Sequence, residues 1–308
     1  MELLYQRDIY GKALVELGKA NPDIVVLDAD LSGSTRTKFF AKEFPERFFN
    51  FGVAEQNMMA TAAGLASKGK TVFVSTFAMF ATGRAWDQVR NTICYNNFNV
   101  KIVATHAGIT VGEDGSSHQA LEDIALMQII PNMKIIVPCD GPQTRQAVIA
   151  AANLAGPFYI RLGRAKFPTI DDKKQFELGK AQVLREGNDI TLVACGLMVK
   201  CALEAADALL AEGVKARVIN IHTIKPIDCD CIVKAATQTG RIIVCEEHSI
   251  TAGLAGCIDQ ALTGESSVKI ARVGIKNQFG QSGAPEKLLE KYGLTTQDII
   301  ATAHSLLS

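Results

Sequence analysis

Two stretches of this 308-residue sequence combine residue types that could carry acid–base chemistry. The stretch GEDGSSHQ (112–119) places two acids and His118 between a strand-like run and a helical pattern. A histidine in such a loop can move a proton near neutral pH. The stretch NFGVAEQNMMATAAGLASKG (50–69) places Glu55 in the first turn of a mostly apolar helix. A buried carboxylate there needs a partner, and a ligand nitrogen could share a proton with it.

Both stretches also have a purely structural interpretation. Glu55 could serve only to compensate the dipole of its helix, and GEDGSSHQ could be an acidic turn in which Ser117 caps the next helix. Gly112 and Gly115 would allow the tight backbone that either kind of loop requires. A cap at Ser117 would also help to fix His118 in place, so the two interpretations of the loop are compatible.

The elements that must position these residues follow a regular order. Strand-like apolar runs alternate with helical patterns up to residue 163, and the alternation resumes at residue 189. Apolar strands separated by helices predict mostly parallel sheets covered by helices, which is the α/β class. Residues 164–180 (RAKFPTIDDKKQFELGK) interrupt this order with proline and charge. We therefore predict two α/β domains, 1–170 and 181–308, joined near residue 175.

Polar groups follow several of the strands expected in the first domain. The stretches are LDADLSGST (27–35), TFAMF (76–80), THAGITVGEDGSSHQ (105–119) and RLGR (161–164). Ligands of open parallel sheets bind beyond the carboxyl ends of the strands. We expect these loops to converge on one site.

The composition argues against several classes of function. Thirty-two basic residues balance thirty-two acidic residues, so no overall charge attracts nucleic acid or an anionic membrane. No apolar run approaches the roughly 18 residues of a membrane span, and the start MELLYQRDIYGKAL shows no signal segment. We expect a cytoplasmic protein whose eight cysteines are mostly buried thiols. His222, His248 and His304 have no spacing suited to a metal ion.

The order and spacing of several motifs resemble the pyrimidine-binding domain of transketolases. The motifs are GVAEQNMMATAAGLA, STFAMF, THAGITVGEDGSSHQALEDIALMQIIPN and YIRLGR. The part from GKAQVLREGNDITLVACG through QFGQSGAPEKLLEKYGL resembles the transketolase C-terminal domain. The first domain of complete transketolases has a GDG motif followed by paired asparagines, which is missing here. The sequence thus resembles the C-terminal subunit of a split transketolase.

This resemblance implies thiamine diphosphate as the cofactor. Glu55 would be catalytic, because its match in the family hydrogen-bonds to the pyrimidine ring and activates the cofactor. Phe77 and Phe80 would hold that ring by stacking and contact, and Asp30 would lie near the thiazolium ring. Gly83 departs from the family pattern, which often has a third aromatic residue there.

The resemblance also implies a sugar-phosphate substrate. His118 would act on the sugar carbonyl and hydroxyl groups as a catalytic residue, and Asp114 would contact a hydroxyl group. The residues that match the phosphate ligands of the family are Arg7, Ser34, His106 and Arg161. Arg84 or Trp86 could rebuild the pocket at Gly83.

Transfer of a two-carbon ketol unit between sugar phosphates is the leading interpretation. An N-terminal transketolase subunit would then bind the diphosphate through magnesium or calcium. We expect a homodimer of this chain and a two-plus-two assembly with that partner. The alternatives are a subunit like deoxyxylulose-phosphate synthase, suggested by RAWDQVRN (84–91), a 2-oxo acid dehydrogenase β subunit, and a non-catalytic regulatory subunit.

Overall fold

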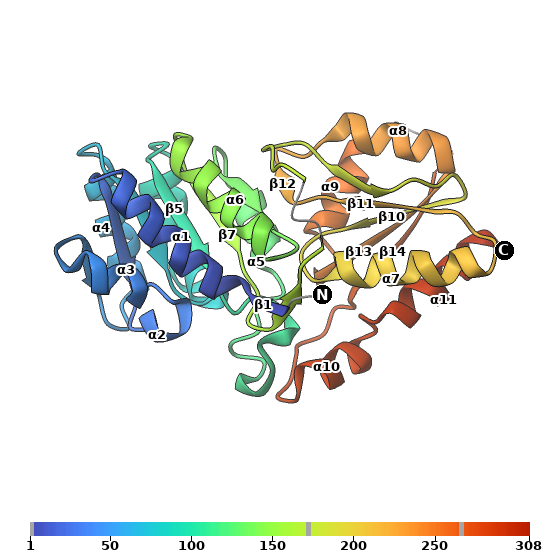
Figure 1. Ribbon diagram of the computed structural model, residues 1–308, viewed down its shortest axis with the longest axis horizontal. Coiled ribbons are helices and arrows are strands. Elements are labelled where there is room, and N and C mark those ends of the chain that lie inside the picture. Colours follow the sequence, from blue (N-terminus) through green and yellow to red (C-terminus); the bar gives the residue numbers. More distant parts are fainter. Residues whose placement is uncertain (1–2, 171–173, 265–267) are drawn as a thin grey trace.

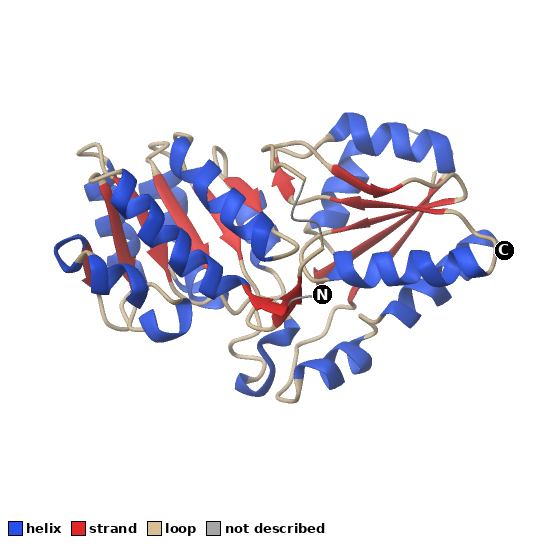
Figure 2. Cartoon of the chain, in the orientation of Figure 1, coloured by secondary structure: helices blue, strands red, loops and turns tan. Residues whose placement is uncertain are grey.

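The computed structural model describes residues 3–170, 174–264 and 268–308, and it shows two α/β halves lying side by side (Figure 1). Each half has a central sheet with helices packed on it (Figure 2). Most strand pairs in the two large sheets are parallel. The α/β class and the mostly parallel sheets predicted from the sequence are confirmed.

The sheet of the first half has the strand order β12-β6-β7-β5-β4-β2-β3. Six of these strands come from the first half of the chain: β2 (Ile24–Asp28), β3 (Phe48–Asn50), β4 (Thr71–Ser75), β5 (Val100–Ala104), β6 (Lys134–Ile136) and β7 (Phe158–Arg161). The helices of this half are α1 (Gln6–Ala20), α2 (Ser32–Thr35), α3 (Lys38–Glu43), α4 (Glu55–Ala66), α5 (Asp123–Gln128) and α6 (Gly141–Asn153).

Both faces of this sheet are buried. Successive residues of a strand point to opposite sides of the sheet, and here each side packs into a core with helices. Val26 and Phe73 belong to a core with residues of α1, α3 and α6. Val25 and Val72 belong to a second core with residues of α4 and α5. The continuous apolar runs seen in the sequence therefore reflect strands that are covered on two sides.

The second half contains a sheet of order β14-β13-β10-β11-β9, in which only β9 is antiparallel to its neighbour. Its strands are β9 (Gln182–Arg185), β10 (Ile190–Ala194), β11 (Ala216–Asn220), β13 (Arg241–Ser249) and β14 (Lys269–Ile275). Its helices are α7 (Met198–Ala211), α8 (Cys229–Thr239), α9 (Leu254–Ala261), α10 (Pro285–Tyr292) and α11 (Thr296–Leu307).

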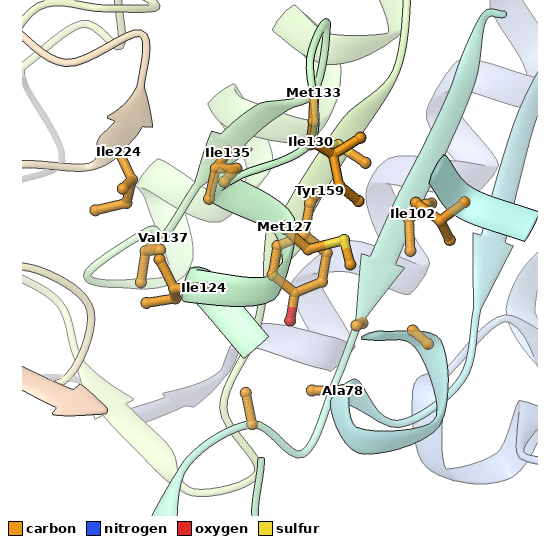
Figure 3. Packing of buried hydrophobic residues seen from close by; sticks show 14 of the residues in the cluster. Ala78, Ile102, Ile124, Met127, Ile130, Met133, Ile135, Val137, Tyr159 and Ile224 are labelled. Atoms are coloured by element: carbon orange, nitrogen blue, oxygen red, sulfur yellow. The ribbon is translucent and has the colours of Figure 1, made fainter. Parts of the chain in front are cut away.

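Two short strand pairs tie the halves and the connecting segment together. β12 (Thr223–Lys225), from the second half of the chain, pairs antiparallel with β6 and completes the first sheet. Ile224 of β12 packs into the same core as Val137 (Figure 3). Within the segment 164–180, β8 (Lys166–Pro168) pairs with β1 (Leu3–Tyr5), while 171–173 lie outside the described residues.

The described residues contain no helix that combines the length and apolar character needed to cross a membrane. They also contain no cluster of three or more His, Cys, Asp or Glu side chains arranged to hold a metal ion. Six of the eight cysteines are buried, as the sequence predicts, whereas Cys231 is half-buried and Cys229 is exposed.

Candidate active site

A cluster of aromatic and imidazole rings lies at the carboxyl ends of β4 and β5. Phe77 follows β4 and His106 follows β5, and their rings stack with centroids 3.9 Å apart. The ring of Phe80 lies 6.0 Å from that of Phe77, with the two ring planes inclined by 17°. His118, from the GEDGSSHQ loop, lies edge-on to Phe80 at 5.2 Å. The predicted convergence of the strand-end loops thus brings these four rings together.

His106 is buried and neutral at physiological pH. Burial, with the nearby guanidinium of Arg7, lowers its pKa to about 3. Its Nδ1 lies 2.8 Å from Thr105 Oγ1, and its Nε2 lies 3.5 Å from Arg7 Nη1. A guanidinium can only donate, so Nε2 is the acceptor and Nδ1 carries the proton that is donated to Thr105.

Positive charge is concentrated beside His106. Arg7, Arg36 and Arg164 are all close enough to lower the pKa of His106, and Arg7 also donates to the backbone oxygen of Ser34 at 3.3 Å. Among the described atoms, Arg7 Nε is buried without a hydrogen-bond partner. Burial and the neighbouring Arg36 lower the pKa of Arg7. This group of arginines can therefore bind an anion that brings acceptors for its free donors.

The structure does not bring Arg161 to this group. Arg161 is 6% exposed and lies at the end of β7, where it donates to both oxygens of Asp123 at 2.7 and 3.2 Å. It also donates to the backbone oxygens of Ala120 and Glu247. The phosphate role expected for Arg161 therefore finds no support in its contacts, which are all interior.

Arg164, the second arginine of the same RLGR motif, lies where Arg161 was expected. It donates to Glu113 at 2.9 Å and to the backbone oxygen of Val111, both in the loop that carries His118. Together with Arg7 it lines an open cavity of about 560 Å³ between the two halves. The RLGR motif could have indicated the correct arginine, because Arg164 follows the end of β7 whereas Arg161 lies within the strand.

Glu55 begins α4 and is 2% exposed. Its carboxylate is held by Arg84, whose Nη1 lies 2.8 Å from Oε1 and 3.0 Å from Oε2. The Arg84 guanidinium also lies over the ring of Phe80, 4.5 Å from its centroid. Of the two residues that could rebuild the pocket at Gly83, Arg84 is the one that contacts Glu55. The indole of Trp86 donates instead to the backbone oxygen of Leu126.

The other predicted site residues, Asp30, Asp114 and Ser34, are exposed or half-buried. Asp30 is exposed and has a positive φ of 63°. Its backbone N–H donates to Asn50 Oδ1 at 2.9 Å, and the amide of Asn50 donates back to its carboxylate at 3.3 Å. Asp114 is exposed on the loop of His118. Ser34 is half-buried, and it is its backbone oxygen that accepts from Arg7.

Ser117 does not cap the following helix, which corrects the structural interpretation of the loop. α5 begins only at Asp123 and has no side-chain cap. Ser117 Oγ instead lies 3.0 Å from Nδ1 of His118. The hydroxyl thereby orients the imidazole, so that Nε2 is left for a ligand.

The second half of the chain holds the loop of His118 in place, which sequence reasoning did not find. Glu247 Oε1 accepts from the backbone N–H of Thr110 at 2.7 Å. Ser282 donates to the backbone oxygen of Glu113 at 2.7 Å, and Gln119 donates to that of Gln281 at 2.9 Å. These contacts join residues that are far apart in the chain, and no local pattern in the sequence announces them.

The donor and acceptor set has a definite chemical preference. The aromatic rings of Phe77 and Phe80, together with the buried carboxylate of Glu55, which accepts hydrogen bonds from the planar Arg84 guanidinium, suit a planar nitrogen heterocycle. The arginines and a neutral histidine suit an anionic group, and the ring of His118 lies beside Phe77 and Phe80 and near His106. The site can therefore hold a heterocyclic cofactor and an anionic substrate side by side.

Comparison with protein families covers both halves. Residues 4–169 match the model of the transketolase pyrimidine binding domain, and residues 179–299 match that of the transketolase C-terminal domain. The chain is 49% identical to a putative transketolase C-terminal section of Methanocaldococcus jannaschii, over 94% of this chain and 92% of that one. It is 39% identical to the 6-deoxy-6-sulfo-D-fructose transketolase subunit SqwH of a Clostridium species, over 99% and 95% of the two chains.

Solved structures agree with these matches. A split-gene transketolase, in an inactive beta4 tetramer, is 52% identical with a TM-score of 0.92, over 99% of this chain and 98% of that one. The transketolase of Campylobacter jejuni is 25% identical with a TM-score of 0.84, and the match covers 99% of this chain but 47% of that longer one.

Proposed function

The chain belongs to the transketolase family, and on this basis we propose that it is one subunit of a split transketolase. It would transfer a two-carbon ketol unit from a ketose phosphate to an aldose phosphate, together with a partner subunit. The observation that carries this proposal is the position of His118, whose ring lies edge-on to both Phe77 and Phe80 and close enough to His106 to help lower its pKa. We propose that His118 is a proton-transferring residue next to a heterocycle site and an anion site.

The heterocycle site fits the aminopyrimidine ring of thiamine diphosphate. Phe77 and Phe80 offer ring faces, and Glu55 offers a buried carboxylate that can accept a hydrogen bond from the ring. When bound, the cofactor would supply the nucleophilic carbon to which the ketol unit is attached. We propose Glu55 as the residue that activates it, and Asp30 as an acid beside its thiazolium ring.

The anion site would receive the phosphate group of the sugar. Arg7 and Arg164 would donate to the phosphate oxygens, and His106 and Ser34 would complete the surroundings. His118, oriented by Ser117, would exchange protons with the sugar hydroxyl and carbonyl groups. Asp114 would contact a hydroxyl group of the sugar from the same loop.

The names of two relatives suggest the substrate class. One is a 6-deoxy-6-sulfo-D-fructose transketolase subunit, and another, 38% identical, belongs to an apulose-4-phosphate transketolase of Phocaeicola vulgatus. Both names denote sugars with an anionic group, which is the chemistry that Arg7 and Arg164 would recognise. We propose a sugar phosphate for this chain.

The diphosphate and its divalent metal, magnesium or calcium, would be bound by an N-terminal transketolase subunit. Relatives that this chain matches over nearly their whole length carry the words C-terminal section or subunit in their names. We propose a two-plus-two assembly with that partner, in a cytoplasmic enzyme. Copies of this chain alone would associate without activity, as in the inactive beta4 tetramer of its split-gene relative.

Reconstitution tests the proposal. The purified chain should show negligible ketol transfer between sugar phosphates, and activity should appear on addition of the N-terminal subunit, thiamine diphosphate and magnesium. Omitting each component in turn provides the controls. Full activity of the isolated chain, or an inactive complex that binds both cofactor and sugar phosphate, would contradict it.

A further inference from the structure

Arg84 contacts two groups that the proposed cofactor would bind, the carboxylate of Glu55 and the ring of Phe80. Its guanidinium pairs with both oxygens of Glu55 and at the same time covers the ring of Phe80. Glu55 is 2% exposed, and its carboxylate cannot meet a second planar ligand on this side while Arg84 stays in place. The same side chain therefore blocks the carboxylate and the ring face together.

The guanidinium resembles the group that it excludes. It is planar, carries a positive charge and presents N–H donors in its own plane. A protonated aminopyrimidine is also planar and presents N–H donors in its plane. In this pocket such a ring would stack on Phe80 and donate hydrogen bonds to Glu55. The Arg84 guanidinium makes these same two contacts.

The backbone around Arg84 is held by a hydrogen bond, whereas its side chain borders solvent. Arg84 ends a π-helical turn (Phe80–Arg84), a rare form that occurs often at functional sites. Gln56, the residue after Glu55, donates to the backbone oxygen of Arg84 at 3.1 Å. The Arg84 side chain itself is 47% exposed, and the preceding residue is Gly83, which has no side chain to confine it.

We propose that Arg84 is an internal substitute for the aminopyrimidine ring, which occupies Glu55 and Phe80 in the unloaded subunit and swings into solvent when the cofactor binds. This inference rests on the proposed function. Its consequence is competition: the cofactor binds only the fraction of molecules in which the pair is open. The charge of Glu55 is satisfied in both states, by Arg84 before binding and by the ring afterwards.

The size of the effect follows from the exposure of the pair. A partly exposed ion pair favours the closed state by up to about fivefold, and the apparent dissociation constant of the cofactor is raised by one plus this ratio of closed to open molecules. Removing Arg84 should therefore tighten cofactor binding about twofold to sixfold. If Arg84 instead supported Glu55 in the loaded enzyme, its removal would weaken binding.

The experiment is calorimetric titration of thiamine diphosphate with magnesium into the reconstituted complex. The variants are Arg84→Met, which keeps the stem but removes the guanidinium, and Arg84→Lys, which keeps the charge without the planar face. Arg90→Met is the matched control. Arg90 lies in the next π-helical segment (Gln88–Cys94), and its guanidinium contacts Asn91 rather than Glu55. We expect tighter binding for Arg84→Met, an intermediate constant for Arg84→Lys and an unchanged one for Arg90→Met.

Crystal structures of the complex with and without cofactor give a second, independent measurement. Arg84 should contact Glu55 only in the unloaded complex. A loaded complex that keeps the Arg84–Glu55 pair, or an Arg84→Met variant with equal or weaker affinity, would overturn the proposal while leaving the function intact. A wild-type complex that binds no thiamine diphosphate would overturn both.

Discussion

The carboxylate of Glu247 in β13 accepts a hydrogen bond from the backbone N–H of Thr110, 2.7 Å away and in the other half of the molecule. The approach is close: a Cβ added to Gly108 would lie 2.3 Å from the carboxyl carbon of Glu247. Gly108 has a φ of 85°, which suits glycine. The loop that carries His118 is thus anchored by a residue of the second half.

Removing this anchor should lower turnover without removing a group that touches the substrate. In the reconstituted enzyme, Glu247→Ala leaves a buried N–H without an acceptor, at a cost of about 1–3 kcal/mol, and displaces the loop. We expect a lower kcat with little change in thiamine diphosphate affinity. Glu247→Gln keeps an acceptor oxygen and should restore most of the activity. Equal loss in both variants would show that the hydrogen bond is not what matters.

Glu55 and His118 should fail in different steps. Glu55→Gln cannot carry the negative charge that stabilises a protonated ring nitrogen, so exchange of the cofactor's thiazolium proton should slow. His118→Ala should leave that exchange near normal and reduce ketol transfer about 100- to 10,000-fold. Deuterium exchange of the loaded complex, followed by NMR, separates the two. Unchanged exchange in Glu55→Gln would mean that another residue activates the cofactor.

Substitutions of the two arginines of the RLGR motif should have different effects, one on substrate binding and the other on stability. Arg164→Gln should raise the KM for a sugar phosphate while the protein keeps its stability, because a phosphate contact is lost. Arg161→Gln should destabilise the fold by about 3–5 kcal/mol, since Asp123 is left buried without its counter-ion. Steady-state kinetics and urea unfolding measure the two effects. A stable Arg161→Gln variant with a raised KM would restore Arg161 to the phosphate site.

Stability should fall in mild acid because of buried neutral histidines. Burial lowers the pKa of His222 to about 4, and burial with Arg7 lowers that of His106 to about 3. The unfolded chain takes up protons at about pH 6.5 that the folded chain refuses, so stability is lost as the pH falls from about 6.5 toward 4. Each histidine contributes at most about 1.4 kcal/mol per pH unit.

His222→Gln removes one of these titrating groups and should reduce the loss of stability between pH 7 and pH 4.5. Urea unfolding at pH 7 and pH 4.5 gives the difference in unfolding free energy for wild type and variant. The gap between the two pH values should be smaller in the variant. An unchanged gap would assign the acid sensitivity to other groups.

Sequence patterns were sufficient to predict the mostly parallel α/β sheets and the convergence of loops that follow the strands. Phe77, His106 and His118 follow strands whose apolar runs are unmistakable, and parallel strands bring their carboxyl ends to one edge. The anchor at Glu247 could not be predicted in this way. Its contact depends on how the two halves pack, and nothing in VCEEHS distinguishes a buried anchor from a solvated acid.

Two further differences from the sequence-based expectations have local causes. Arg161 is the last residue of β7, a strand that is covered on both faces, and its side chain points into the interior. Arg84 contacts Glu55 from the last residue of a π-helical turn, a local form that no pattern in the sequence indicated.

The pairing of β12 with β6 makes the first sheet depend on the second half for its edge. A recombinant fragment that stopped near residue 175 would leave the backbone groups of Ile135 and Ile136 open to strands of other molecules, which favours aggregation. A chimera that exchanged the second half with that of a relative would need to preserve the register of Thr223 opposite Ile136. The two halves should therefore be kept together in engineered variants, and truncation or exchange at the boundary between them should be avoided.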